Sequence, residues 1–301
     1  MALTIHPNAL IALAAAASWG GGDFSGGMGV KAAGGSVAGA LRLVIVAYAV
    51  SLAVLLGVVW LRHDAWPGDP LHNALVGWGV AGGVAAGFAL VAFYIALSRG
   101  AMGASAAVSG LLAAAIPAVV SSVMEGAPTV LRLAGFALAA AAIWLIAAGP
   151  ADGAAQRSTM GLAIFGGLGF GFYFVALRMD NPLGVFEPMV LSRAGSLVTC
   201  LVLLALLQTQ RSQRTPRDAK SAGLSRGAVG WAMGVVLFDT GGNLLFLTST
   251  RLGRLDVAAV LASLYPAGTI LLAGWRLHER PTRRQVAGMA VALAAVVMIT
   301  V

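Results

Sequence analysis

Cysteine is nearly absent from this sequence. The one cysteine, Cys200, lies inside an apolar run, so neither an intrachain disulfide nor a cysteine-based metal cluster can form. The four histidines fall at chain ends or in expected loops, and none belongs to an HExxH pattern. A glycine-rich phosphate loop ending in Lys-Ser or Lys-Thr is also missing, which excludes direct use of ATP by that mechanism. The sequence therefore predicts no metal site and no cofactor.

Charged residues are scarce as well. They make up 10% of the 301 residues, against roughly 25% in soluble domains, while 59% of the residues are hydrophobic. Most charges fall between apolar stretches of about 18 to 25 residues, the length that crosses about 30 Å of hydrocarbon. Glycine is abundant, with 40 residues, and small residues let membrane helices approach closely. The composition indicates an integral membrane protein that has the lipid bilayer as a partner.

The net charge of +8 raises the question of nucleic acid. The basic residues, however, flank the apolar stretches, where anionic lipid and retention on the cytoplasmic side favour them. We therefore expect no nucleic-acid partner.

Apolar runs bounded by charge, proline or glycine predict ten transmembrane helices and an all-α membrane protein. Five helices are expected near residues 8 to 29, 36 to 60, 74 to 97, 102 to 123 and 130 to 149. Five more are expected near 159 to 178, 184 to 208, 228 to 249, 255 to 275 and 284 to 301. The first run is expected to be a helix and not a cleaved signal peptide, because no basic segment precedes it.

The two halves of the chain repeat one pattern. Trp19 and Arg42 have the same separation as Phe170 and Arg193, at an offset of 151 residues. Further along each half, residues 96 to 100 correspond to 248 to 252, and 125 to 128 correspond to 279 to 281. Each unit has an odd number of spans, so the second copy must enter the membrane with opposite polarity. We therefore predict two inverted five-helix repeats, residues 1 to 150 and 151 to 301.

These residues carry a resemblance to a known family. Over its whole length the chain resembles the EamA-type ten-helix carriers of the drug/metabolite transporter superfamily. The best-matching segments are Leu41-Arg42-Leu43, Leu191-Ser192-Arg193, Ala262-Ser263-Leu264-Tyr265-Pro266 and His278-Glu279-Arg280-Pro281. The first half departs from the usual pattern, since Pro117 lies only eight residues before Glu125, whereas Pro266 lies thirteen before Glu279. The fourth and ninth helices are therefore expected to bend at different depths.

Two aspartates in expected helices are the main candidates for transport chemistry. Asp239 lies near the middle of the eighth helix, with Asn243 one turn later on the same face and no basic residue within ten positions. It needs a partner on another helix, a water-filled cavity or a proton; the alternative is a neutral side chain hydrogen-bonded for packing. Asp23, among glycines of the first helix, is a second candidate, and its alternative is a solvated position at the interface near Lys31.

Arg42 and Arg193 occupy equivalent repeat positions about two turns inside their helices, within reach of an interface. They are expected either to anchor helix ends or to bind an anionic group, including the carboxylate of Asp23 or Asp239. Aromatic residues complete the candidate set. Trp19 and Phe170 would approach a cavity between the repeats, with Tyr173 and Tyr265 nearby, although each could also serve packing alone.

The resemblance implies a secondary transporter of small organic solutes, amino-acid-like or amphipathic, in the cell membrane. Export by alternating access is the leading hypothesis, with protons as the coupling ion and a homodimer left open. A membrane-embedded enzyme and a non-transporting sensor or scaffold are the alternatives.

The orientation in the membrane is left open by two conflicting arguments. Loops after odd-numbered helices carry twelve Lys or Arg residues and loops after even-numbered helices carry five. By the positive-inside rule, both termini would face outward. The family resemblance implies the opposite orientation, with both termini inside.

Overall fold

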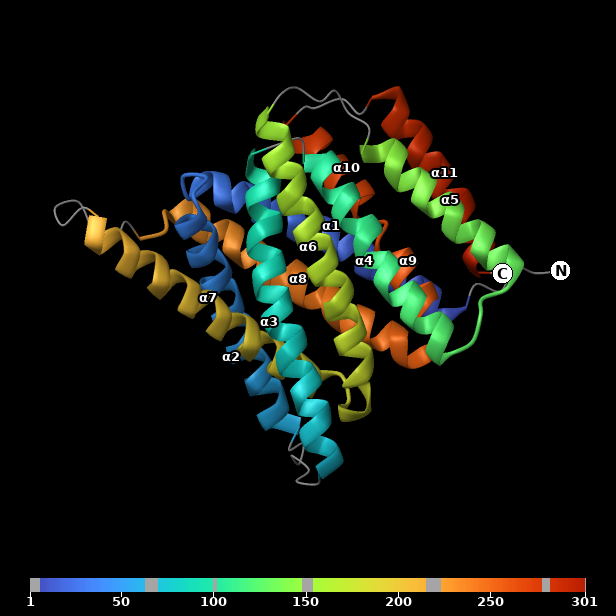
Figure 1. Ribbon diagram of the computed structural model, residues 1–301, viewed down its shortest axis with the longest axis horizontal. Helices are drawn as coiled ribbons and strands as arrows, with labels where there is room; N and C mark the ends of the chain where they lie inside the picture. The colour runs from blue at the N-terminus through green and yellow to red at the C-terminus, as the bar shows by residue number, and fades with distance from the viewer. Residues whose placement is uncertain are drawn as a thin grey trace.

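A computed structural model describes residues 6–62, 70–99, 102–147, 154–214, 223–277 and 282–300, and in these ranges the chain is helical (Figure 1). The elements are α1 (Pro7–Ala32), α2 (Val37–Arg62), α3 (Pro70–Arg99), α4 (Met102–Met124), α5 (Val130–Ala147), α6 (Ala154–Met179), the 3-10 helix η1 (Asn181–Leu183), α7 (Phe186–Arg214), α8 (Arg226–Leu252), α9 (Leu255–Ala262), α10 (Tyr265–Leu277) and α11 (Arg283–Thr300). The predicted all-α fold class is confirmed.

Among the residues that the structure describes, seven helical stretches are long and apolar enough to cross a membrane. They are Val37–Arg62, Asn73–Arg99, Ser105–Met124, Ser158–Met179, Phe186–Gln210, Arg226–Leu252 and Leu255–Arg276. Helix α1 is equally long but rich in glycine and serine, and 16 of its 26 residues are buried in protein. It therefore meets other helices over most of its surface, where small residues are an advantage.

The ninth predicted span, residues 255 to 275, matches the candidate span Leu255–Arg276, and its helix is interrupted between α9 and α10. Pro266 has no amide hydrogen, and its ring crowds the carbonyl four residues earlier. At the break, Ser263 Oγ donates to the carbonyl of Ala259 at 2.7 Å, and the amide of Ala267 donates to the carbonyl of Leu264 at 3.0 Å. In contrast, α4 continues through Pro117.

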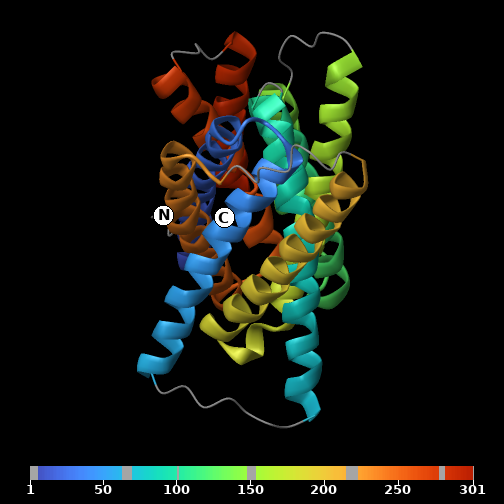
Figure 2. The ribbon, with the colours of Figure 1, turned by 90° about the vertical axis from the view of Figure 1, so that its left-hand side faces the viewer.

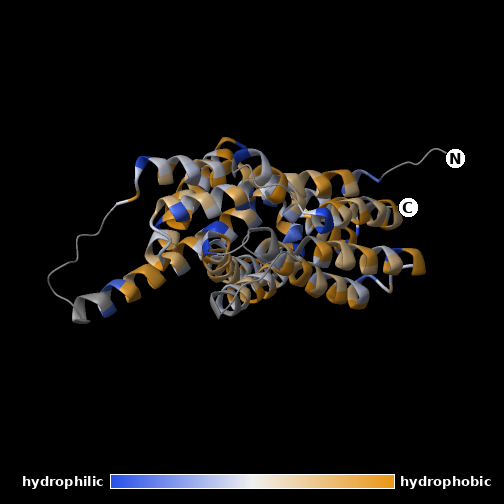
Figure 3. Ribbon diagram, turned by 90° about the horizontal axis from the view of Figure 1, so that it is seen from above, coloured by the Kyte–Doolittle hydropathy of each residue, from blue (hydrophilic) through white to orange (hydrophobic). Residues whose placement is uncertain are grey.

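Large apolar side chains on the outside of the molecule indicate where lipid would lie. Trp60, Val123 and Trp275 are exposed by 73%, 83% and 76%. Figure 3 shows apolar residues along much of the length of the helices. A water-soluble surface rarely carries so much apolar area, whereas hydrocarbon accepts it without cost.

Helices of the first half pack along helices of the second half. Helix α1 lies along α8 and α3 lies along α6, while α2 contacts α7 at one side of the bundle and α5 contacts α11 at the other (Figures 1 and 2). Exchanging the two halves converts α1–α8 into α3–α6 and maps α2–α7 and α5–α11 onto themselves, as expected of a two-fold repeat. Arg42 and Arg193 also lie in the second helix of their halves. The two-fold relation between the halves stays a prediction.

Glycines set the distance between α1 and α8. A Cβ atom on Gly242 would lie 2.5 Å from Cδ1 of Trp19, and a Cβ atom on Gly22 would lie 3.2 Å from the backbone nitrogen of Asp239. Neither contact leaves room for a larger side chain at the usual van der Waals distance. The close approach brings Trp19 and Asp239 to the same place in the centre of the bundle.

Candidate functional site

A cavity lies between helices from both halves of the chain. Its lining residues are Trp19 and Asp23 of α1, Tyr48 of α2, Ala86 and Leu90 of α3, Phe170, Tyr173 and Phe174 of α6, Asp239 and Asn243 of α8, and Tyr265 of α10. Its empty volume is about 390 Å³, of which about 30 Å³ is wide enough for the centre of a water molecule. Binding sites for small organic molecules usually measure roughly 300–1,000 Å³, far more than these 30 Å³. In this conformation the cavity is narrow, so a substrate must widen it to bind.

Asp239 forms an ion pair with Arg193 beside the cavity. Nη2 of Arg193 donates to Oδ2 of Asp239 at 2.6 Å, and the arginine residue has no exposed surface. Asn243 donates to the other carboxylate oxygen, Oδ1, at 3.2 Å and to the backbone carbonyl of Asp239 at 2.7 Å. The sequence left several options for Asp239, and the structure shows one of them, a charged partner on another helix, which is Arg193 of α7.

The position of Arg193 differs from the expectation that it lies near an interface, because the whole side chain is buried in the core. Its guanidinium stacks over the ring of Tyr48, with Cζ 4.2 Å from the ring centroid. Its Nε donates to Ser51 Oγ at 3.3 Å, and Ser51 in turn shares a 2.7 Å hydrogen bond with Thr240. Burying a charge is costly unless it is paired and hydrogen-bonded. Nε and Nη2 of Arg193 have such partners, whereas Nη1 is buried without a hydrogen-bond partner among the described residues.

Asp23 of α1 also lines the cavity and is 7% exposed. It is nine residues from the end of α1, so the alternative of a solvated interfacial carboxylate does not hold. Its Oδ2 is buried and has no hydrogen-bond partner among the described residues. The site thus contains two carboxylates, of which only Asp239 has a positively charged neighbour.

Aromatic rings form much of the cavity wall. The rings of Trp19 and Phe174 are stacked, with centroids 5.0 Å apart and planes 6° apart. Tyr265 meets Trp19 edge-on, with centroids 6.4 Å apart, and Phe246 lies behind Phe174 at 4.6 Å. Offset and edge-to-face pairs of this kind hold rings in fixed orientations. The cavity therefore presents ring faces and edges that are already positioned by their neighbours.

Most of the residues singled out in the sequence meet at this one place. Seven of them line the cavity: Trp19, Asp23, Phe170, Tyr173, Asp239, Asn243 and Tyr265. Arg193 lies directly behind Asp239. Arg42 is half-buried and is not one of the cavity residues. At the 152-residue offset seen between Arg99 and Arg251, the counterpart of Asp239 is Gly87, so the first half has a glycine where the second half has this carboxylate.

Sequence reasoning missed Tyr48 and Tyr94. Tyr48 lines the cavity, and the hydroxyl of Tyr94 lies 3.5 Å from the carbonyl of Gly22, next to Asp23. A signal was available, because the chain has only four tyrosines and both of these fall inside long apolar runs. Tyrosines of membrane helices usually gather at the interfaces, so a tyrosine in mid-helix points to a polar interior.

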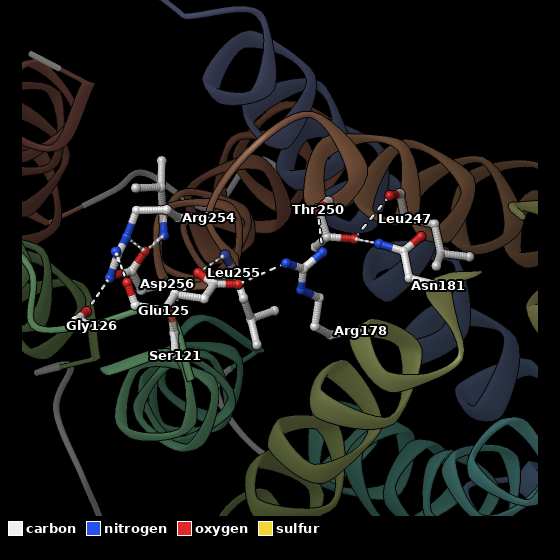
Figure 4. A network of polar contacts seen from close by, with 11 residues as sticks. Ser121, Glu125, Gly126, Arg178, Asn181, Leu247, Thr250, Arg254, Leu255 and Asp256 are labelled. Atoms are coloured by element: carbon white, nitrogen blue, oxygen red, sulfur yellow. Dashed lines mark hydrogen bonds and ion pairs between the residues drawn. The ribbon is translucent and has the colours of Figure 1, made fainter. Parts of the chain in front are cut away.

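A polar network closes one end of the bundle, and Glu125, directly after α4, is its centre (Figure 4). Its Oε1 accepts from Nη2 of Arg178 on α6 at 2.9 Å. Its Oε2 accepts from the backbone amide of Leu255 on α9 at 3.1 Å and from Ser121 Oγ at 2.8 Å. One carboxylate therefore joins the ends of α4, α6 and α9.

Arg254 strengthens this junction from the start of α9. It donates to the carbonyls of Glu125 and Gly126 at 2.9 and 2.8 Å and pairs with Asp256 at 2.9 Å. The hydrogen bond with Asp256 raises the pKa of Arg254 above its ordinary value, so this guanidinium keeps its charge.

The network continues to α8 and η1. Arg178 donates to the carbonyl of Thr250 at 2.9 Å, and Asn181 donates to Thr250 Oγ1 at 3.2 Å (Figure 4). Arg251 donates to the carbonyl of Asn181. Thr250 lies seven residues after Asn243, which is about 10 Å along the helix axis. The network therefore lies about two turns beyond the cavity, at the end where α4, α6 and α8 finish.

Asp180 is a further buried carboxyl near this end, between α6 and η1. It has no exposed surface, and neither carboxyl oxygen has a hydrogen-bond partner among the described residues. A Cβ atom on Gly79 of α3 would lie 2.8 Å from its Oδ2, so the carboxyl is pressed against a neighbouring helix. Burial raises the pKa of Asp180 to about 8.

Comparison with known proteins gives a family and a fold. A model of the EamA-like transporter family matches residues 157–301. A crystal structure of a protein with 16% sequence identity covers 99% of this chain and 99% of its own, with a TM-score of 0.67. That likeness establishes the fold alone. No curated protein matches the sequence.

Proposed function

The chain belongs to the EamA-like transporter family and is a multi-pass membrane transporter, and we propose that it is a secondary carrier that exports small organic metabolites by alternating access. The cell membrane is the proposed location. Within this proposal, the substrates are amino-acid-like or amphipathic compounds. A homodimer is compatible with the proposal.

The observation that carries the proposal is the position of the cavity. It is lined by α1, α2 and α3 of the first half of the chain and by α6, α8 and α10 of the second half. Transporters of inverted-repeat architecture bind substrate near the bilayer midplane at the interface of the repeats. Intramembrane carboxylates at such a place are functional by default, since each is costly to bury.

The polar network supports alternating access. It joins α4 of the first half to α6, α8 and α9 of the second, so it holds the two halves together at one end. Opening the cavity at that end requires the contacts of Glu125 and Arg254 to break. By the charge count, this end faces outward, and the present conformation would then be closed toward the outside.

Protons are the proposed coupling ion. Export against a gradient needs a group in the cavity that exchanges a proton for substrate, and the candidates are the carboxyls of Asp23 and Asp239. Asp239 has Arg193 as a counter-charge at 2.6 Å, which favours its ionised form. Asp23 has no such partner among the described residues, so it is the better placed of the two to exchange a proton.

The test is a flux measurement on purified protein in liposomes. A panel of labelled amino acids, amines and carboxylates is measured with and without a pH gradient. We expect accumulation of at least one solute that depends on the gradient and is lost in the Asp23→Asn variant. If no solute crosses the bilayer above the protein-free rate while the folded protein alters a substrate chemically or binds it without moving it, the carrier proposal is wrong.

A further inference from the structure

The charges around the cavity do not balance. Asp23 and Asp239 both line it. Among the described residues, the only basic side chain that forms an ion pair with either of them is Arg193, which lies immediately behind Asp239. None of the cavity residues described is Lys, Arg or His. With both carboxylates ionised, the site has one negative charge more than it has positive charges, and that charge belongs to Asp23.

The buried oxygen of Asp23 marks where a positive charge is missing. Oδ2 has no hydrogen-bond partner among the described residues, although the residue is only 7% exposed. An ionised carboxylate in such a place is unstable unless a cation or a proton arrives. The surrounding walls decide which kind of cation fits.

The walls next to this carboxylate are aromatic. Trp19 is one helical turn before Asp23, and its ring stacks on Phe174 at 5.0 Å and meets Tyr265 edge-on at 6.4 Å. Phe170 and Tyr173 extend the same lining from α6. Ring faces attract organic ammonium groups, and several rings around one carboxylate form the kind of cage that binds alkylated amines. Six of the eleven lining residues are aromatic, whereas a small inorganic cation would need several oxygen ligands that converge on one point.

A free carboxylate group on the ligand has no corresponding partner. The guanidinium of Arg193 is fully buried, donates to Asp239 at 2.6 Å and stacks over Tyr48 at 4.2 Å. Its Nη1 has no hydrogen-bond partner among the described residues, but the guanidinium lies behind Asp239 and is not part of the described cavity wall. A zwitterion would therefore place its carboxylate against Asp23 and Asp239 without a counter-charge.

From these observations we propose that the substrate is an organic monocation, an alkylated or arylalkyl ammonium compound, which binds with its charge at Asp23 and its apolar part among Trp19, Phe174 and Tyr265. The assignment rests on the proposed function, because it treats the cavity as the transport site. It narrows the amino-acid-like or amphipathic substrates to amphipathic compounds with one positive charge.

The experiment measures equilibrium binding of labelled benzyltrimethylammonium to the detergent-purified full chain. In wild-type protein, we expect competition by arylalkyl amines and none by the uncharged carbon isostere, 2,2-dimethylpropylbenzene, or by phenylalanine. In Asp23→Asn we expect the Kd to rise about tenfold to a hundredfold, the effect of losing one charged contact. Asp180→Asn is the matched control, since it removes another buried, unpartnered carboxyl outside the cavity and should bind as the wild type does.

The ligand series on the wild type keeps the proposal testable if Asp23→Asn does not fold. Equal affinity for benzyltrimethylammonium and its uncharged isostere, or an unchanged Kd in folded Asp23→Asn, would overturn the cation assignment. Liposome flux separates this assignment from the transport function. Flux of phenylalanine without binding of the cation overturns the assignment and leaves the carrier intact, whereas charge-dependent binding of the cation without any flux supports the site and counts against transport.

Discussion

Arg193 and Asp239 form an ion pair across α7 and α8, with 2.6 Å between Nη2 and Oδ2, beside a cavity that the same aspartate lines. Only one of the two partners therefore contacts the space where substrate is proposed to bind. The pair gives Asp239 a positively charged neighbour, whereas Asp23 Oδ2 has no hydrogen-bond partner among the described residues. The predictions below begin from this division between the two aspartates.

Asp239→Asn should destabilise the protein as well as impair transport, because Arg193 would remain buried without its counter-charge. Removal of one partner of a buried ion pair typically costs about 3–5 kcal/mol. Denaturant or thermal unfolding in detergent measures the loss, and liposome flux measures the transport defect.

The control for this prediction removes both charges together. The double variant Arg193→Met with Asp239→Leu has no orphaned ion, so we expect much of the stability to return while transport stays lost. If Asp239→Asn unfolds at the wild-type temperature and still accumulates substrate under a pH gradient, the ion pair contributes neither to stability nor to transport.

Arg178→Gln should loosen the closed end of the bundle, because it removes the ion pair with Glu125 and the hydrogen bond to the carbonyl of Thr250. The measurement is the labelling rate of an Ala86→Cys probe in the cavity, in a Cys200→Ala background, with an impermeant thiol reagent. A partly exposed pair contributes a modest free energy, so we expect a rise of roughly two- to fivefold.

Arg276→Gln is the matched control for the loosened end. Arg276 is exposed in the last turn of α10, at the opposite end from the network, so the same substitution should leave the labelling rate unchanged. Equal rates in wild type, Arg178→Gln and Arg276→Gln would mean that the network is not a barrier to the cavity.

The buried carboxyl of Asp180 should make stability fall as pH rises. Burial raises its pKa to about 8, whereas in the unfolded chain an aspartate titrates near about 4. Between these values the folded protein holds a proton that the unfolded chain has lost. The free energy of unfolding should therefore decrease with rising pH, by up to about 1.4 kcal/mol per pH unit.

The Asp180→Asn variant isolates this contribution from other titrating groups. Its unfolding free energy should exceed that of the wild type at pH 8 and approach it near pH 5, measured by denaturant unfolding across that range. A difference between the two proteins that is constant with pH would show that Asp180 does not titrate in this window.

The charge distribution predicts that the loop between α7 and α8 faces the cytoplasm. Much of this loop, with Arg217 and Lys220, lies outside the described residues, but Gly223 at its end is described and exposed. In a Cys200→Ala background, Gly223→Cys should resist an impermeant reagent added to intact cells. Ala127→Cys, exposed in the α4–α5 loop at the opposite end, should react. The reverse pattern would favour the orientation that the family resemblance implies.

The sequence by itself determined the helices and the class of protein. A span must carry about twenty apolar residues to cross the hydrocarbon, so hydropathy and length predict where a helix lies, and most predicted boundaries agree with the structure to within a few residues. The ninth helix shows the limit of that reasoning. Pro266 marked a bend, yet only the structure shows that the helix stops at Ala262 and begins again at Tyr265.

The tertiary structure decided which polar residues meet. Arg193 and Asp239 are 46 residues apart, and nothing local to either one specifies the other as its partner. Their pairing depends on how far each helix is rotated about its axis and on how closely neighbouring helices pack, which contacts such as that between Gly22 and Asp239 fix. Hydropathy does not contain this information, because lipid and protein interior are both apolar. That is why the sequence could nominate Asp23, Asp239 and Arg193 together, and only the packed bundle neutralises one aspartate and leaves the other unpaired.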